Sequence, residues 1–398
     1  MCSQKLLKVF EVVFPRLVSG SGIILLSLLT PIVMSIEESA VFLVGISLLY
    51  LMFMLSKVGL DVLLIKEAAI SEKRVNARQF TYILIPVFLA STLSLVAFLL
   101  SEKVPYMKEF YWVLLTLPNF VLLGMCSSLL RGKGHDSASA YSEVGIVSFL
   151  VSLILTIFLV LRLPMEVGLV FAWASFSISV FFAFYIFCKF RFELAFELRA
   201  QDFLSARYFL YSQLASYLTQ WLPLYFIATY DAKLSVYYAV ANRMAGVITF
   251  LGVTIDMYSA PRFASARVNS LNCALAYKRK MDRLSLLVVL AILPVMILVS
   301  VVYGQMVNYE HQYYLISLAL IIGYALAVAL GPNGYFLMMS GYEKLAYEIT
   351  KYSFFLICIF SVISWGFNKL ELLPFFVALC VVARAAVLKI ALIRVVKL

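Results

Sequence analysis

The stretch ILIPVFLASTLSLVAFLL, residues 83–100, decides the fold class, because eighteen consecutive residues carry no charged side chain. A second stretch, LLVVLAILPVMILVSVV at residues 286–302, has the same character. Each is apolar all round, and a helix of about 20 such residues crosses the hydrocarbon core of a bilayer. A transmembrane β-barrel would show segments of about ten residues that alternate between apolar and polar. The two stretches therefore predict membrane-spanning helices.

The composition supports a membrane protein and excludes several other classes. Of 398 residues, 64% are hydrophobic and 13% are charged, whereas soluble domains carry about 25% charged residues. Soluble enzymes, disordered chains and disulfide scaffolds are thereby excluded. The net charge of +11 is scattered over short connectors, so it favours membrane topology over nucleic-acid binding. The six cysteines form no C-x-x-C pair and have no partner histidine spacing, so neither a zinc site nor a redox pair is expected. No metal and no cofactor is expected.

The apolar stretches predict an all-α polytopic membrane protein with about twelve transmembrane helices. Two longer connectors, at residues 189–207 and 258–283, separate some of them, and the first divides the chain into two six-helix bundles. The bundles are residues 1–190 and 208–398, joined by a linker at 191–207. The spans are expected near residues 12–34, 39–60, 80–100, 110–130, 144–161, 167–188, 208–230, 235–257, 284–303, 313–338, 352–367 and 372–388.

The orientation follows from the positions of lysine and arginine. With these spans, 23 of the 32 basic residues fall on the side of the amino terminus, 5 on the other side and 4 inside spans. Cytoplasmic loops carry the excess of positive charge, so both termini are expected in the cytoplasm. Residues 129–134, at the end of span four, are weakly similar in sequence to residues 337–344, at the end of span ten. This similarity suggests that the two halves are a parallel repeat.

Four cations lie inside predicted spans: Arg16, Lys57, Arg243 and Arg384. A charge in the bilayer core is costly and normally faces a cavity or a partner. Arg243 is near the middle of its span and is the best substrate-binding candidate, with a hydrogen-bond hub between helices as the alternative. Arg16 binds substrate or snorkels to the headgroups. Lys57 binds substrate or pairs with Asp61 four residues on, and Arg384 is expected to snorkel or pack at the bundle edge.

Polar side chains on spans seven and eight extend this candidate site. Gln213, Tyr217 and Gln220 recur at helical spacing on span seven, and Asn242 precedes Arg243 on span eight. Amides and aromatic rings suit sugar hydroxyls and sugar rings. Polar adhesion between helices explains the same pattern. In span ten, Gly331-Pro332-Asn333-Gly334 predicts either a hinge beside a cavity or a simple kink.

Acidic residues near the spans are candidates for coupling transport to an ion gradient. They are Asp256, Asp61 and Glu143, although capping or charge balance is the favoured explanation for them. The two histidines lie in connectors, no carboxylate pair lies within a span and no phosphate-binding loop is present. An enzyme is therefore not expected, and neither is an ATP-driven pump.

The chain resembles the Wzx-type oligosaccharide flippases, a polysaccharide biosynthesis protein family in the multidrug and oligosaccharidyl-lipid exporter superfamily with a MATE-like fold. The resemblance covers nearly the whole chain. It depends on the two sets of six spans and on short segments of spans one, four, eight and ten: Arg16, Leu130-Arg131-Gly132, Tyr237 to Arg243 followed by Ala260-Pro261-Arg262, and Gly341 to Lys344.

The resemblance implies a transporter that moves a polyprenyl-diphosphate-linked oligosaccharide, such as an O-antigen unit for lipopolysaccharide, across the bacterial inner membrane by alternating access. It implies a cationic cavity in which Arg16, Lys57 and Arg243 hold the diphosphate, proton or sodium coupling, and polysaccharide polymerase and chain-length proteins as partners. A multidrug or cation antiporter of the same superfamily is the first alternative. A polytopic polymerase or ligase is the second, but it would be expected to carry a long outer catalytic loop, and every outer connector here is about ten residues or fewer.

Overall fold

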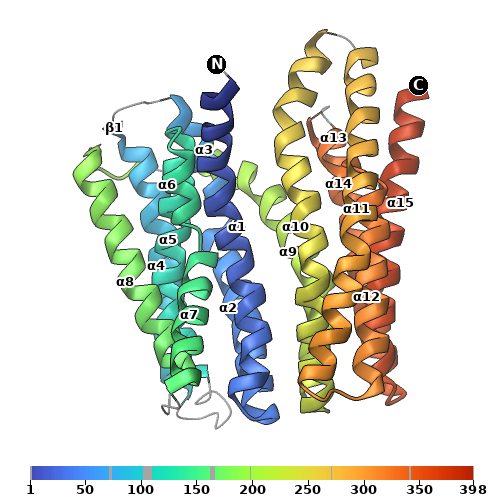
Figure 1. Ribbon diagram of the computed structural model, residues 1–398. Helices are drawn as coiled ribbons and strands as arrows, with labels where there is room; N and C mark the ends of the chain where they lie inside the picture. The colour runs from blue at the N-terminus through green and yellow to red at the C-terminus, as the bar shows by residue number, and fades with distance from the viewer. Residues whose placement is uncertain are drawn as a thin grey trace. The chain divides into compact units, whose positions relative to one another are not determined.

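The chain is helical almost throughout (Figure 1). The computed structural model describes the backbone of residues 2–70, 74–101, 110–161, 166–197, 199–269, 271–339 and 342–397, and the side chains of most of these. The helices of the first half are α1 Cys2–Val33, α2 Ile36–Lys57, α3 Leu60–Ile70, α4 Ala77–Ser101, α5 Tyr111–Gly132, α6 Asp136–Tyr141, α7 Gly145–Leu161 and α8 Val167–Lys189. Those of the second half are α9 Ala200–Ala228, α10 Ala232–Asn269, α11 Leu271–Met306, α12 His311–Ala329, α13 Asn333–Met339, α14 Glu343–Gly366, a 3₁₀ turn η2 Leu370–Leu372 and α15 Leu373–Lys397.

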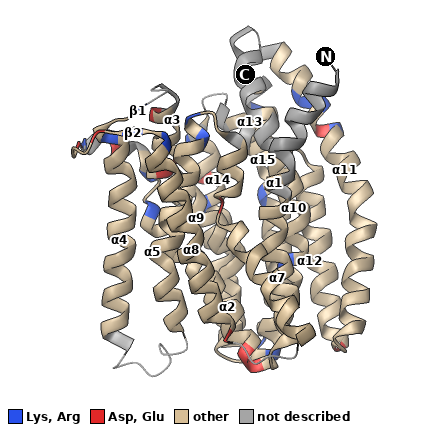
Figure 2. Cartoon of the chain, turned by 60° about the vertical axis from the view of Figure 1, so that its left-hand side comes forward, with Lys and Arg blue, Asp and Glu red and all other residues tan. Residues whose placement is uncertain are grey.

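The helices confirm a polytopic membrane protein. Within the described ranges, nine helices are long and apolar enough to cross a membrane, and shorter apolar helices lie at Val18–Val33 and Gly145–Leu161. Each predicted span falls on a separate helix: α1, α2, α4, α5, α7, α8, α9, α10, α11, α12, α14 and α15. Figure 2 shows charged residues concentrated at the helix ends, with few in the middle of the helices.

The chain forms two compact units, Met1–Leu214 and Ala215–Leu398. The boundary lies inside α9, and the predicted linker 191–207 contains the strand β2, Arg191–Phe192, and the start of α9. Helices α10 and α11 continue through almost all of the predicted connector 258–283, so this connector is helical. At about 1.5 Å per residue, the 38 residues of α10 are longer than a bilayer core is thick.

Each unit is built around its fourth span. In the first unit, α5 packs against α2, α4 and α8, and aromatic rings lie between them. For example, the ring centroids of Phe53 on α2 and Phe120 on α5 are 5.5 Å apart. In the second unit, α12 packs against α10, α11 and α15. Because spans two, three and six surround span four in both units, the internal packing supports the predicted parallel repeat.

A short helix follows span four in both units, after a glycine with positive φ. Gly134 (φ 75°) precedes α6 and Gly331 (φ 88°) precedes α13. Span ten was expected to continue to residue 338, but α12 ends at Ala329 because Pro332 offers no N–H to continue the helix. Residues 330–334 are therefore the structural equivalent of the turn at Gly134. Residues 337–344, which the sequence similarity predicted as the equivalent, lie further along the chain.

The second predicted span is also interrupted. Ser35 begins α2 with a capping box, in which its hydroxyl accepts from Glu38 N–H and the Glu38 carboxylate accepts from Ser35 N–H. The helix ends at Lys57, where Val58 (φ 52°) and Gly59 (φ 76°) turn the chain before α3. A β-branched residue with positive φ is strained. A methyl group on Gly59 would lie 2.5 Å from the Ala206 carbonyl oxygen, so the first turns of α9 fix this break.

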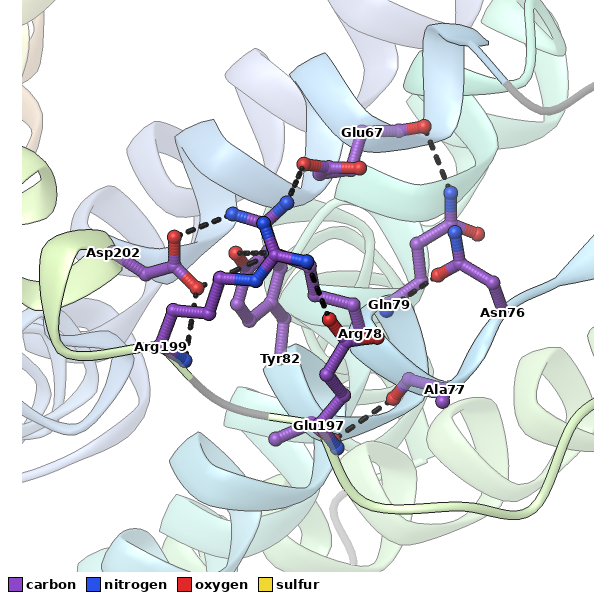
Figure 3. Close-up of polar contacts among 10 residues, drawn as sticks. Glu67, Asn76, Ala77, Arg78, Gln79, Tyr82, Glu197, Arg199 and Asp202 are labelled. Carbon is purple, nitrogen blue, oxygen red and sulfur yellow. Dashed lines mark hydrogen bonds and ion pairs between the residues drawn. The ribbon is translucent and has the colours of Figure 1, made fainter.

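The segment before α9 is bound to the first unit by a small parallel sheet and an ion-pair cluster. Strand β1, Arg74–Val75, pairs with β2. Arg78 at the start of α4 contacts the carboxylates of Glu67 at 2.6 Å and Asp202 at 2.5 Å (Figure 3). Asp202 also accepts the Arg199 N–H at the start of α9. The cluster therefore joins α3, α4 and α9.

Candidate functional site

Arg243 and Trp221 form the centre of the candidate site in the second unit. Arg243 is close to the midpoint of the α10 span Ala232–Ile255, and its guanidinium carbon lies 4.0 Å from the centroid of the Trp221 ring on α9. Trp221 stacks in turn on Tyr217, one helical turn earlier, with ring centroids 6.2 Å apart. The arrangement holds a cation on a buried aromatic face at membrane depth.

Asn242 joins three helices beside this cation. Its Oδ1 accepts a hydrogen bond of 2.8 Å from the Tyr324 hydroxyl on α12, and its Nδ2 donates to the Gln220 carbonyl oxygen at 3.4 Å. The Tyr238 hydroxyl donates to the same carbonyl. Asn242 is therefore a structural link between α9, α10 and α12 that positions Arg243, and Gln220 takes part through its backbone.

Arg384 belongs to the same region, contrary to the expectation that it snorkels or lies at the bundle edge. Its Nη1 donates to the Ser216 hydroxyl on α9 at 3.2 Å. Tyr324 is within electrostatic reach of both Arg384 and Arg243. No carboxylate in the described part of the chain forms an ion pair with Arg384. A cation inside the last predicted span was the only sequence signal for this residue.

Open space lies next to Arg243. Gly246 follows it by one helical turn, and a methyl group built on Gly246 would meet no other atom within 4 Å. A second arginine, two aromatic rings and two polar side chains are gathered around Arg243 in the second unit. Such an arrangement can bind an anion by charge-assisted hydrogen bonds.

Lys57 lies in the first unit and is paired. Its Nζ is 2.7 Å from Asp61 Oδ2, across the break between α2 and α3, and 4.4 Å from the centroid of the Phe53 ring. Asp61 is 8% exposed, and its Oδ1 has no hydrogen-bond partner. The pair matches the alternative of an ion pair for Lys57, and it leaves one carboxylate oxygen unsatisfied.

The remaining described candidates, Glu143 and Gln213, belong to the first unit. Glu143 forms an ion pair of 2.8 Å with Arg131, which ties the start of α7 to the end of α5. Gln213 is half-buried on the part of α9 that belongs to the first unit. The helices α1 and α10 include Arg16 and Asp256, but their side chains lie outside the described residues. Among the described side chains, no group of His, Cys, Asp and Glu could hold a metal ion.

No protein-family model and no curated protein matches this sequence. Solved structures do match over nearly its whole length. An outward-facing multidrug resistance MATE transporter of the MOP superfamily is 14% identical with a TM-score of 0.65, covering 96% of this chain and 93% of its own. The MATE transporter VcmN of Vibrio cholerae is 12% identical with a TM-score of 0.66, covering 99% and 98%.

A third match is a MOP superfamily transporter from Pyrococcus furiosus. It is 14% identical with a TM-score of 0.59, covering 96% of this chain and 94% of its own, and is described as having a binding pocket of reverse polarity that suggests a different function. At these identities the matches establish a shared fold. The chain has the MATE-like fold of MOP transporters, as predicted.

Proposed function

We propose that this chain is a transporter for an anionic amphiphile, and specifically a flippase for polyprenyl-diphosphate-linked oligosaccharides of a bacterial inner membrane. The observation that carries the proposal is the pair of interior arginines in the second unit: Arg243 on the Trp221 ring and Arg384 on the Ser216 hydroxyl. The MATE-like fold supports transport rather than catalysis. It is compatible with proton or sodium coupling and with polymerase and chain-length proteins as partners.

The chemistry of the site favours a diphosphate over a cation. A guanidinium offers a planar set of N–H donors that matches phosphate oxygens, and it repels a positively charged drug. In a low-dielectric interior such contacts replace the hydration that a diphosphate loses. Arg243 and Arg384 would bind the diphosphate, and Tyr217 and Trp221 would contact a sugar ring. Gln213 and Gln220 would bind hydroxyl groups.

The proposal also assigns roles to residues of the first unit and to the acidic residues that could couple transport to an ion gradient. Arg16 and Lys57 would bind the headgroup before it reaches Arg243. Of the three acidic candidates, Asp61 is the best placed for proton coupling, because its unsatisfied Oδ1 is buried beside Lys57. Glu143 is favoured as a structural partner of Arg131, and Asp256 remains a candidate by sequence.

A multidrug antiporter is the second candidate, and the MATE structures that share the fold favour it. The sign of the interior charge separates the two functions, since export of a cation favours buried carboxylates. A charged substrate of each sign therefore provides the decisive comparison.

The test is transport by the purified full chain in proteoliposomes. One substrate is a prenyl-diphosphate disaccharide with a dithionite-quenchable fluorophore, and the other is ethidium. We expect the chain to expose the inner-leaflet diphosphate lipid to dithionite and to leave ethidium unmoved. Movement of ethidium alone would support the antiporter and overturn the flippase. Arg243→Ala should slow the diphosphate lipid, and an unchanged rate in that variant would contradict its assigned role.

A further inference from the structure

A second concentration of positive charge lies in the first unit, where α8 ends and the two-stranded sheet begins. Arg74 and Arg191 are direct partners in the parallel register of β1 and β2, and both side chains are exposed. Side chains opposite each other in a sheet are neighbours on the same face, and like charges there destabilise the pair. The sheet therefore places two arginines side by side.

Two lysines approach the same corner around Phe190. Lys133 donates to the Arg74 carbonyl oxygen at 2.7 Å and lies 5.9 Å from the Phe190 ring. Lys189 lies 3.4 Å from Nδ1 of His135, whose ring is 5.8 Å from that of Phe190. Burial lowers the pKa of Lys133. We call Arg74, Lys133, Lys189 and Arg191 the basic corner.

Two cations of the basic corner have no carboxylate partner in the described part of the chain. Neither Lys189 nor Arg191 forms an ion pair with any carboxylate in the described ranges. Glu193 follows Arg191 by two positions and is exposed, but it pairs with neither cation. An external anion would relieve the repulsion among these side chains.

An exposed aromatic face leads along α8 to this corner. Along one stretch of α8, every third or fourth residue is exposed and apolar: Trp173, Phe176, Val180, Phe184 and Phe187. The first of these residues is 69% exposed and the last is 65% exposed. This spacing places them on one side of the helix. Since α8 is a candidate membrane span, this face is in contact with lipid chains, and Lys189 follows it at the bilayer surface.

Apolar side chains are also exposed just beyond the sheet. Leu194 is 72% exposed and Phe196 is 67% exposed, and both follow Arg191 on the segment that enters α9. Exposed apolar groups beside cations at the end of a span suit the boundary between headgroups and acyl chains. A soluble anion would use the cations but not this apolar surface.

We propose that the basic corner binds an anionic phospholipid, with the phosphate between Lys189, Arg191 and Arg74 and an acyl chain along the exposed face of α8. The bound lipid belongs to the leaflet at this end of α8 and is separate from the transported substrate. The proposal does not depend on the proposed function. By bridging α8 and the two strands of the sheet, the lipid stabilises the segment that leads into α9.

Native mass spectrometry of the purified full chain with phosphatidylglycerol or phosphatidylcholine tests the site. We expect preferential retention of phosphatidylglycerol. Lys189→Gln combined with Arg191→Gln should weaken its binding about thirty-fold, from the usual contribution of two cations near an anionic lipid surface. Lys189→Arg combined with Arg191→Lys should retain it. Equal binding by the native chain and the glutamine variant would overturn the proposal.

The matched control removes the same two charges elsewhere. Arg279 and Lys280 are adjacent, exposed residues of α11, and their replacement by glutamine should change binding less than about threefold. An equal loss in this control would show general charge attraction and overturn the proposed site. Competition by inorganic phosphate as effective as by phosphatidylglycerol would identify a free anion instead. A photoreactive phosphatidylglycerol should label residues 173–196 of the native chain, and labelling confined to other segments would also contradict the proposal.

Discussion

The guanidinium carbon of Arg243 lies 4.0 Å from the centroid of the Trp221 ring, and the two residues come from different helices of the second unit. A cation on an aromatic face is stabilised by about 0.5–2 kcal/mol, with the larger values in desolvated sites. The contact therefore restricts the orientation of the Arg243 guanidinium relative to the Trp221 ring.

Arg243→Gln should lower the rate of diphosphate-lipid transport by about 10–100-fold, because a hydrogen bond to a charged group contributes about 1.5–3 kcal/mol. Trp221→Leu should have a smaller effect, since the charge remains and only its orientation is lost. The measurement is the rate of dithionite quenching in proteoliposomes with matched amounts of protein. A larger loss for Trp221→Leu than for Arg243→Gln would contradict this order of roles.

Arg384→Gln should lower the transport rate to a similar degree, whereas Ser216→Ala should leave it within about threefold. The reason is that Ser216 accepts one hydrogen bond from Arg384 Nη1, so its loss leaves the charge in place. The paired comparison separates a ligand-binding charge from a structural contact between α9 and α15. If both variants lose transport equally, the contact itself is essential and Arg384 does not act as a phosphate ligand.

The sequence predicts the helices well and the contacts between them poorly. Apolar length alone locates each span, because the bilayer sets a minimum that few soluble segments reach. The break between α2 and α3 was missed, since Val58 favours neither a turn nor positive φ and only tertiary contact with Ala206 fixes it. The two-residue strands β1 and β2 have no sequence signature.

The candidate site shows the same limit. Arg243 could be predicted because a central charge in a span requires a partner. Its partner Trp221 and the bond from Tyr324 to Asn242 depend on how α9, α10 and α12 pack. Arg384 could not be distinguished from a snorkelling cation, because its distance from the end of the span is the same in both cases.

Asp202→Asn should destabilise the first unit by about 2–3 kcal/mol. This value lies between the loss of about 0–1 kcal/mol for an exposed ion pair and about 3–5 kcal/mol for a buried one. The side chain of Asp202 is 7% exposed and that of its partner Arg78 is 22% exposed. The loss leaves Arg78 with Glu67 alone among its described ion pairs. Thermal or denaturant unfolding in detergent measures the change. Glu197→Gln, which removes an exposed pair with Arg199, is the control and should change stability by less than about 0.5 kcal/mol.

The same carboxylate predicts a dependence on pH. Burial alone raises the pKa of Asp202, but hydrogen bonds from Arg78 and Tyr82 outweigh burial and lower the pKa below the ordinary value of 3.8. Because the pKa is lower in the folded chain, this group contributes stability above the ordinary value, and the contribution is lost as the pH falls through the lowered pKa. The difference in stability between the native chain and Asp202→Asn should therefore shrink below about pH 4. A difference that stays constant down to pH 2 would exclude the ion pair as its cause.

Gly145→Ala should destabilise the first unit, because α1 and α7 cross with almost no space between their backbones. A methyl group on Gly145 would lie 2.1 Å from the Ser19 carbonyl oxygen, and one on Gly22 would lie 2.4 Å from the Gly145 carbonyl oxygen. The two helices must separate to admit either group, and overpacking of this kind costs about 1–3 kcal/mol or more. Small residues allow such close crossings between membrane helices.

Gly246→Ala is the matched control for this crossing. The added methyl group meets no atom within 4 Å, and alanine favours a helix over glycine by about 1 kcal/mol. We therefore expect the unfolding temperature in detergent to fall for Gly145→Ala and to stay equal or rise for Gly246→Ala. Both changes add one methyl group to a helical glycine, but Gly145 is the first residue of α7 and gains less from helix propensity than Gly246 inside α10. The opposite directions of the two shifts therefore test the contact between α1 and α7. Equal unfolding temperatures for the two variants would mean that the helices can separate at no cost, contrary to the close approach of Gly145 and Ser19.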